Sequence, residues 1–122
     1  MTVAEKLFIA CLNAKDYKVL YIVQRKWLVG IDVKEYNLIM DYYREHGDVI
    51  GIKTFCSEFK LDMSSVDARP AFYLNSLKER FIFSMMSDNI PKILHGLKDD
   101  PREKLLKLQG LVSMLSVDAV ES

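Results

Sequence analysis

The sequence predicts an all-α fold, in which about four short helices form a small globule and a two-helix hairpin follows at the C-terminal end. Apolar residues recur at steps of three and four along most of the chain, which is typical of amphipathic helices. Residues that favour helix starts and stops stand at the ends of these segments. The best strand candidate is VLYIV at 19–23, but its flanks favour a helix.

Length and composition are those of one globular domain. The chain has 122 residues, of which 50% are hydrophobic and 28% are charged, so it can bury enough apolar surface to offset the entropy of folding. We expect a single domain at 1–118, with the globule at about 1–66 and the hairpin at about 70–117. Residues 118–122 resemble the start of a linker.

The formal net charge is zero, because seventeen Lys and Arg residues balance seventeen Asp and Glu residues. Nucleic-acid binders usually carry a basic excess that neutralises phosphates. We therefore expect no tight binding of DNA or RNA. The lysines and the arginine between 92 and 107 are interpreted as a solvated helix face.

The first helix is predicted to begin at a capping box formed by Thr2 and Glu5. Its apolar face includes Leu7 and Cys11, and Asn13 is the expected stop. A second short helix is predicted at 16–24.

An apolar turn separates this helix from the third one. Trp27 is expected to fill the core there, and Gly30 is expected to end the turn, with Asp32 capping the helix that follows. Gly47 stands where a left-handed helix end favours glycine. His46 lies in the last turn, where a cation interacts favourably with the helix dipole, so a structural role is sufficient for it.

A fourth helix is predicted at 52–59, followed by a polar connector at 60–69. Pro70 suits the first turn of the fifth helix. Leu74, Leu77, Phe81 and Met85 form one apolar stripe on that helix. We expect Pro91 to kink or interrupt it.

The last helix begins with Asp100 as cap and carries a stripe of leucines and a valine at steps of three and four, which predicts packing on a partner helix. Two paired helices hide only one stripe each, so the remaining apolar surface is expected to make the chain a dimer, or a ring at higher concentration. The candidate interface residues are Leu77, Phe81, Ile82, Met85, Met86, Leu105, Leu108, Val112 and Leu115.

Motifs for catalysis and cofactor binding are missing from this sequence. The five glycines form neither GxGxxG nor GxxxxGK[ST], and neither His46 nor His95 belongs to a metal-binding pattern. Cys11 and Cys56 are interpreted as small core residues. We therefore predict no catalytic, cofactor-binding or metal-binding residue and no enzyme activity.

No signal peptide pattern precedes the first helix, and no apolar run is long enough to cross a bilayer. These observations predict a cytoplasmic protein without membrane contact, with both cysteines unpaired.

Several segments taken in order resemble the N-terminal domain of DnaB-type replicative DNA helicases, especially the phage versions. They are LFIACL at 7–12, YYREHGDV at 42–49, TFCSEF at 54–59, YLNSLKERFIF at 73–83 and DDPREKLLKL at 99–108. Family patterns similar to LLGALL, YYxxHGxxP and YxxxLxxR fall on Leu7 to Leu12, on Ile39 to Asp48, and on Tyr73, Leu77 and Arg80. Gly51 and Ile52 depart from a Pro or Ser that many members carry.

The resemblance implies a role in DNA replication as a collar that supports hexamer assembly through hairpins paired between subunits. It also implies docking of primase or of a helicase loader. In the family, ATP and Mg²⁺ are used by a RecA-like motor that follows the domain, and the sequence has no such motor. We therefore expect an isolated N-terminal domain, or a product that lacks its motor.

Three alternatives remain open at this point. One is the helicase-binding domain of a primase, which resembles the same fold, although a start at Met1 argues against a C-terminal domain. Another is a small helical enzyme that uses Cys56. The third is a free-standing phage regulator that binds a host replication protein through Met85 and Met86.

Overall fold

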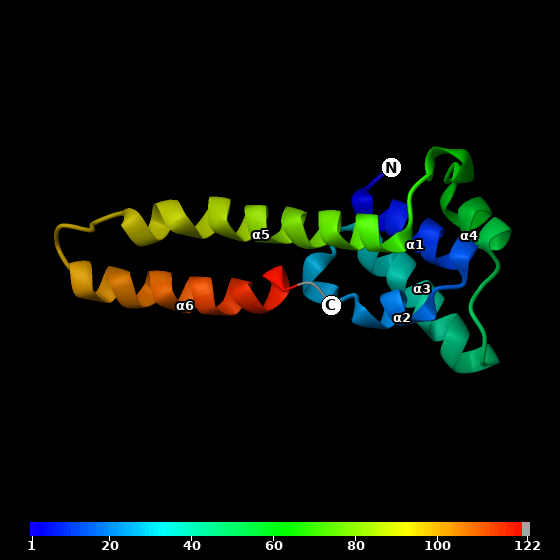
Figure 1. The fold of residues 1–122 in the computed structure, drawn as a ribbon, viewed down its shortest axis with the longest axis horizontal. Coiled ribbons are helices and arrows are strands. Elements are labelled where there is room, and N and C mark those ends of the chain that lie inside the picture. Colours follow the sequence, from blue (N-terminus) through cyan, green and yellow to red (C-terminus); the bar gives the residue numbers. More distant parts are fainter. Residues whose placement is uncertain (121–122) are drawn as a thin grey trace. The chain divides into compact units, whose positions relative to one another are not determined.

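Six α-helices make up most of this protein, whose computed structural model describes residues 1–120 (Figure 1). The helices are α1 (Val3–Ala14), α2 (Tyr17–Ile22), α3 (Ile31–His46), α4 (Ile52–Phe59), α5 (Pro70–Leu94) and α6 (Pro101–Ala119). Two 3₁₀ turns, η1 (Arg25–Trp27) and η2 (Met63–Ser65), complete the regular structure, and the described residues contain no strand. The predicted all-α fold class is confirmed.

The chain divides into two compact units, unit 1 at Met1–Leu77 and unit 2 at Lys78–Ser122. The division falls inside α5, whereas the sequence predicted a boundary between 66 and 70. Unit 1 holds the first four helices and the first turns of α5. Unit 2 holds the rest of α5 together with α6, which form the predicted hairpin.

Helix α1 begins at the predicted capping box. The Glu5 N–H donates to the Thr2 hydroxyl oxygen at 3.0 Å, and the Thr2 N–H donates to Oε1 of Glu5 at 2.7 Å. Both reciprocal bonds satisfy amide groups that would otherwise lack a partner in the first turn. The helix continues to Ala14 and ends at Lys15 in the left-handed conformation, with φ of 54°, so Asn13 is not its stop.

The core of unit 1 surrounds α1, which packs against α2, α3 and α4. The Phe8 ring lies 5.8 Å from the ring of Tyr36 and 6.4 Å from that of Phe55, measured between centroids. Trp27, in η1, is only 2% exposed, which confirms its predicted burial. Its neighbour Val29 is 62% exposed, so the apolar turn is only partly buried.

Helix α3 starts one residue earlier than the predicted cap. Gly30 takes the N-cap position, and Asp32 lies in the first turn. The Asp32 carboxylate accepts hydrogen bonds from the Thr2 hydroxyl at 2.7 Å and from the Val29 N–H at 3.4 Å. Asp32 therefore links the start of α1 to α3 as well as binding a local amide. At the other end Gly47 has φ of 71°, the conformation that favoured glycine in the prediction.

Helix α5 is not interrupted at Pro91, and helix α6 extends past the predicted end of the hairpin at 117. Helix α5 begins at Pro70 as predicted, but it passes through Pro91 without interruption and ends at Leu94. Helix α6 begins after Asp100, whose carboxylate accepts from the Glu103 N–H at 3.1 Å. It continues to Ala119, so residues 118 and 119 are helical and not linker. The predicted linker residues 121 and 122 lie outside the described residues.

Candidate interaction site

The predicted interface residues do not form one continuous surface. Leu77 belongs to unit 1, where it is fully buried, and Leu115 is 6% exposed. Four others, all in unit 2, are half-buried: Phe81, Ile82, Met85 and Leu108. The exposed members are Met86, Leu105 and Val112, at 43%, 56% and 56%. Leu77 is therefore removed from the candidate interface, because a core residue has no surface to offer.

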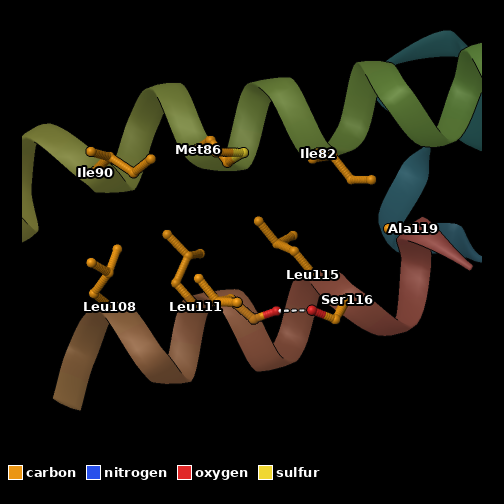
Figure 2. Close-up of a pocket in the computed structure, with 9 residues that line it drawn as sticks. Ile82, Met86, Ile90, Leu108, Leu111, Leu115, Ser116 and Ala119 are labelled. Carbon is orange, nitrogen blue, oxygen red and sulfur yellow. Dashed lines mark hydrogen bonds between the residues drawn. The ribbon is translucent and has the colours of Figure 1, made fainter. Parts of the chain in front are cut away.

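An apolar groove of about 240 Å³ lies between the two helices of unit 2 (Figure 2). Helix α5 contributes Ile82, Met86 and Ile90 to its lining. Helix α6 contributes Leu108, Leu111, Val112, Leu115, Ser116 and Ala119. The Ser116 hydroxyl donates to the Val112 carbonyl oxygen at 2.6 Å, so the one polar side chain of the lining already has its partner. The groove therefore offers apolar contact and no polar chemistry.

The face that α5 presents to this groove differs from the predicted stripe. Leu77 and Ile82 are five residues apart, which places their side chains roughly 140° apart around a helix. Ile90 also lines the groove and continues the spacing of Ile82 and Met86, but it was not among the candidate interface residues. On α6, Leu111 points toward α5 in the groove (Figure 2), although it is not one of the candidate interface residues.

Apolar side chains, some exposed and some half-buried, border the groove on both helices. Phe83, Met86, Ile90 and Leu94 follow one another at i, i+3, i+7 and i+11 on α5, and Leu105, Leu108 and Val112 share a stripe on α6. Phe83 is 73% exposed and Leu94 is 48% exposed. Each stripe includes residues that line the groove, so the two stripes flank it. We call these seven residues the hairpin face.

A buried group of carboxyl side chains lies in unit 1. Glu35 and Asp32 on α3 are fully buried, and Glu5 on α1 is 7% exposed. Neither carboxyl oxygen of Glu35 has a hydrogen-bond partner. Burial first, and then the neighbouring Glu5 carboxyl and the charge of Asp32, raise the pKa of Glu35 to about 8. Glu35 is therefore held as a neutral acid near pH 7.

Neither His46 nor the two cysteines have the surroundings of a catalytic group. His46 is exposed and lies beside the Tyr42 ring, with centroids 4.3 Å apart. Both cysteines are buried and unbonded to each other. Burial, followed by the charge of Asp16, raises the pKa of Cys11 to about 12. Burial, followed by the charge of Asp62, also raises the pKa of Cys56, which is opposite to the activation that a nucleophile needs.

Both thiols should therefore react slowly in the folded chain. Labelling with iodoacetamide between pH 7 and 8.5 is expected to be much slower than labelling of the same chain unfolded in guanidinium. In the folded chain the buried cysteines are protonated and the reagent cannot reach them. Mass spectrometry of each cysteine-containing peptide measures the rate. Rapid labelling of folded Cys56 well below pH 8 would contradict this expectation and favour the enzyme alternative.

Within residues 1–120, no three His, Cys, Asp or Glu side chains are placed to hold a metal ion. None of the described helices has the length and apolarity that crossing a membrane would require.

Comparisons with protein-family models, with curated proteins and with solved structures found no match for this chain.

Proposed function

We propose that this chain is a protein-interaction domain that self-associates through its C-terminal hairpin. The observation that carries the proposal is the hairpin face, where Phe83, Leu94, Leu105 and Val112 are 48–73% exposed around an apolar groove. One aromatic side chain can bury on the order of 150–250 Å². The face therefore offers on the order of several hundred Å² of apolar surface, a size that marks interaction sites on monomers.

A second hairpin is the occupant that fits this face. Two helices side by side present a shallow groove, and a second pair of helices fills such a groove in a four-helix bundle. Related by a two-fold axis, the two copies would bury the same residues on both sides. The lining offers no unpaired polar side chain, so its burial against apolar residues would leave no hydrogen bond unmade.

The resemblance to DnaB-type helicases suggests the context of this association. There the domain would act as a collar that supports assembly of the hexamer and the docking of primase or of a loader. Nucleotide chemistry would belong to a separate motor, so the proposal assigns no cofactor to this chain. The buried, unactivated thiols are consistent with a role in interaction.

The exposed Met86 gives the regulator alternative its support, since flexible methionines suit varied partners. In that case the hairpin face would receive a different protein and the isolated chain would stay monomeric. Oligomeric state therefore separates the two functions.

The test is a charge placed in the hairpin face. Val112→Asp should convert the associated chain to a monomer, because a carboxylate would be buried without a partner in the interface. Light scattering after size exclusion, from about ten to several hundred micromolar chain, measures the mass. Val112 is 56% exposed in the single chain, so the monomer should still fold.

Val117→Asp is the matched control, since Val117 is 71% exposed on the same helix and lies roughly 140° away from Val112. It should associate like the unmodified chain. A monomeric unmodified chain at hundreds of micromolar, or equal dissociation of both variants, would refute self-association through this face. If Val112→Asp unfolds, Val112 is a core residue and not an interface residue.

A further inference from the structure

We propose that a second surface, formed in unit 1 by Tyr21 on α2, Arg25 in η1, and Met40 and Arg44 on α3, binds an acidic helical segment of another protein. We call it the arginine surface. All four residues belong to unit 1, so the proposal does not depend on pairing of the hairpins.

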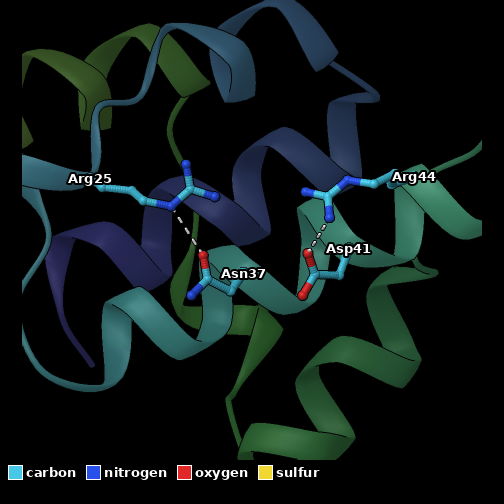
Figure 3. Close-up of polar contacts among 4 residues, drawn as sticks. All are labelled: Arg25, Asn37, Asp41 and Arg44. Atoms are coloured by element: carbon cyan, nitrogen blue, oxygen red, sulfur yellow. Dashed lines mark hydrogen bonds and ion pairs between the residues drawn. The ribbon is translucent and has the colours of Figure 1, made fainter.

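The two arginine side chains are held in place by neighbours on α3 (Figure 3). Nε of Arg25 donates to Oδ1 of Asn37 at 3.1 Å, and the guanidinium lies 5.1 Å from the centre of the Tyr36 ring. Nη1 of Arg44 lies 3.4 Å from Oδ1 of Asp41. The contacts with Asn37 and the Tyr36 ring orient Arg25, which therefore loses less conformational freedom when a ligand binds, whereas Arg44 has only an exposed ion pair.

Their geometry leaves donors for a ligand. The terminal nitrogens of Arg25 have no partner within residues 1–120, since only Nε bonds Asn37. The guanidinium groups point toward one another in Figure 3. Their supports, Asn37 and Asp41, are four residues apart, or about 6 Å along the helix. Carboxylates at i and i+4 of a partner helix have nearly this spacing, and a guanidinium pairs with each in a planar fork.

An apolar depression lies between α2 and α3, and its lining includes Tyr43, the residue that precedes Arg44. Tyr21 is 59% exposed, and its ring meets the Tyr43 ring edge to face, with centroids 6.0 Å apart. Tyr21, Met40 and Tyr43 line the same shallow depression. Exposed Tyr with neighbouring Arg is the composition of binding hot spots. The depression itself has room for no more than about one water molecule, so an apolar residue of the partner would rest against the exposed Tyr21 ring.

Charge favours an acidic protein segment over a nucleic acid. Lys18 is exposed one turn before Tyr21 on α2, so three positive charges, on Lys18, Arg25 and Arg44, stand against the two acids Asp41 and Glu45. Glu45 follows Arg44 on α3, and the chain as a whole is neutral. A long polyphosphate chain would run past both acids, whereas a short segment that reaches only the two arginines would lie near Asp41 alone.

The test titrates a synthetic helical peptide, with glutamates at i and i+4 and a leucine between them, into the isotope-labelled full chain. NMR shifts should move at Tyr21, Arg25, Asn37 and Arg44, and binding should weaken as salt rises. The same peptide with glutamine in place of glutamate should move them far less. No shift with either peptide at about millimolar concentration would overturn the proposal, as would shifts confined to unit 2.

Variants assign the binding to the arginines. Arg25→Ala with Arg44→Ala should weaken binding roughly tenfold or more, since both charged contacts are lost. Lys53→Ala with Arg69→Ala removes the same charge from exposed positions elsewhere in unit 1 and should have little effect. If the two double variants weaken peptide binding equally, net charge alone explains the effect, and the proposal that the arginine surface binds the peptide is wrong.

Arg25→Lys with Arg44→Lys provides a variant that keeps the charge if the alanine pair unfolds. It should still weaken binding several-fold, because lysine lacks the planar fork. A single-stranded oligonucleotide serves as the competing probe. If it alone shifts these residues, the surface binds nucleic acid and the proposal is wrong. Light scattering of each variant should show unchanged association, which keeps this test separate from that of the hairpin face.

Discussion

Replacing Trp27 by alanine should lower the free energy of unfolding by about 3–5 kcal/mol and the melting temperature by roughly 10 °C or more. The indole is 2% exposed, and Leu28 beside it is 6% exposed. Truncation would remove a large apolar contact area and leave a cavity that the surrounding helices fill only in part. Chemical denaturation followed by circular dichroism measures the effect.

Phe72→Ala is the control for this substitution. Phe72 is an aromatic residue of the same unit that is 62% exposed, so its removal should change stability little. A melting temperature of Trp27→Ala close to that of the unmodified chain would show that the tryptophan is accessible in solution. It would then become a candidate anchor for a partner.

Raising the pH from 5 to 8 should destabilise the folded chain, and Glu35 is the reason. Its pKa is about 8 in the folded chain and near the ordinary 4.5 when unfolded. A raised folded pKa means that stability is fully present below the unfolded value and is lost as pH rises through the folded value. In this window each pH unit costs about 1.4 kcal/mol, so the loss amounts to a few kcal/mol.

Glu35→Gln should remove most of this dependence, since glutamine has nearly the same shape and no proton to lose. The variant should therefore gain stability relative to the unmodified chain as pH rises from 5 to 8. Urea denaturation at several pH values measures the difference, and changes from the two histidines cancel in the comparison. Burial of the glutamine amide can change the free energy of unfolding by the same amount at every pH, which leaves the dependence of stability on pH unaffected.

Glu58→Gln, at an exposed position on α4, is the matched control and should keep the pH dependence of the unmodified chain. If the free energy of unfolding changes with pH in the same way for Glu35→Gln and for the unmodified chain, Glu35 ionises with an ordinary pKa in the folded chain. In that case water or a local opening would reach the carboxyl group between α1 and α3.

Local chemistry made much of the helical fold predictable. The capping box at Thr2 and Glu5, the left-handed glycine at 47 and the cap at Asp100 all depend on residues within one turn of each other. Hydrophobic spacing likewise indicated helices over the remaining segments. The apolar turn around Trp27 indicated that this residue is buried. Such features need no knowledge of distant neighbours, because their hydrogen bonds close locally.

Helix ends near prolines and acids were less predictable. Pro91 disfavours a helix interior, yet α5 passes through it and continues for three more residues. Asp32 has the chemistry of an N-cap, but Gly30 takes that position. Local preference is a matter of a few kcal/mol at most, and contacts made elsewhere by the same element can exceed it.

By itself, the sequence determined the all-α class, the order of the helices and most of their starts. Only the tertiary structure decided which side of each long helix is buried. Leu77 fills the core of unit 1, whereas Ile82, Met86 and Ile90 on other sides of α5 line the groove of unit 2. The tertiary structure also placed the acid of Glu35 beside that of Glu5, thirty residues away in sequence. Periodicity shows that a helix has an apolar side, but burial and pKa depend on neighbours that are distant along the chain.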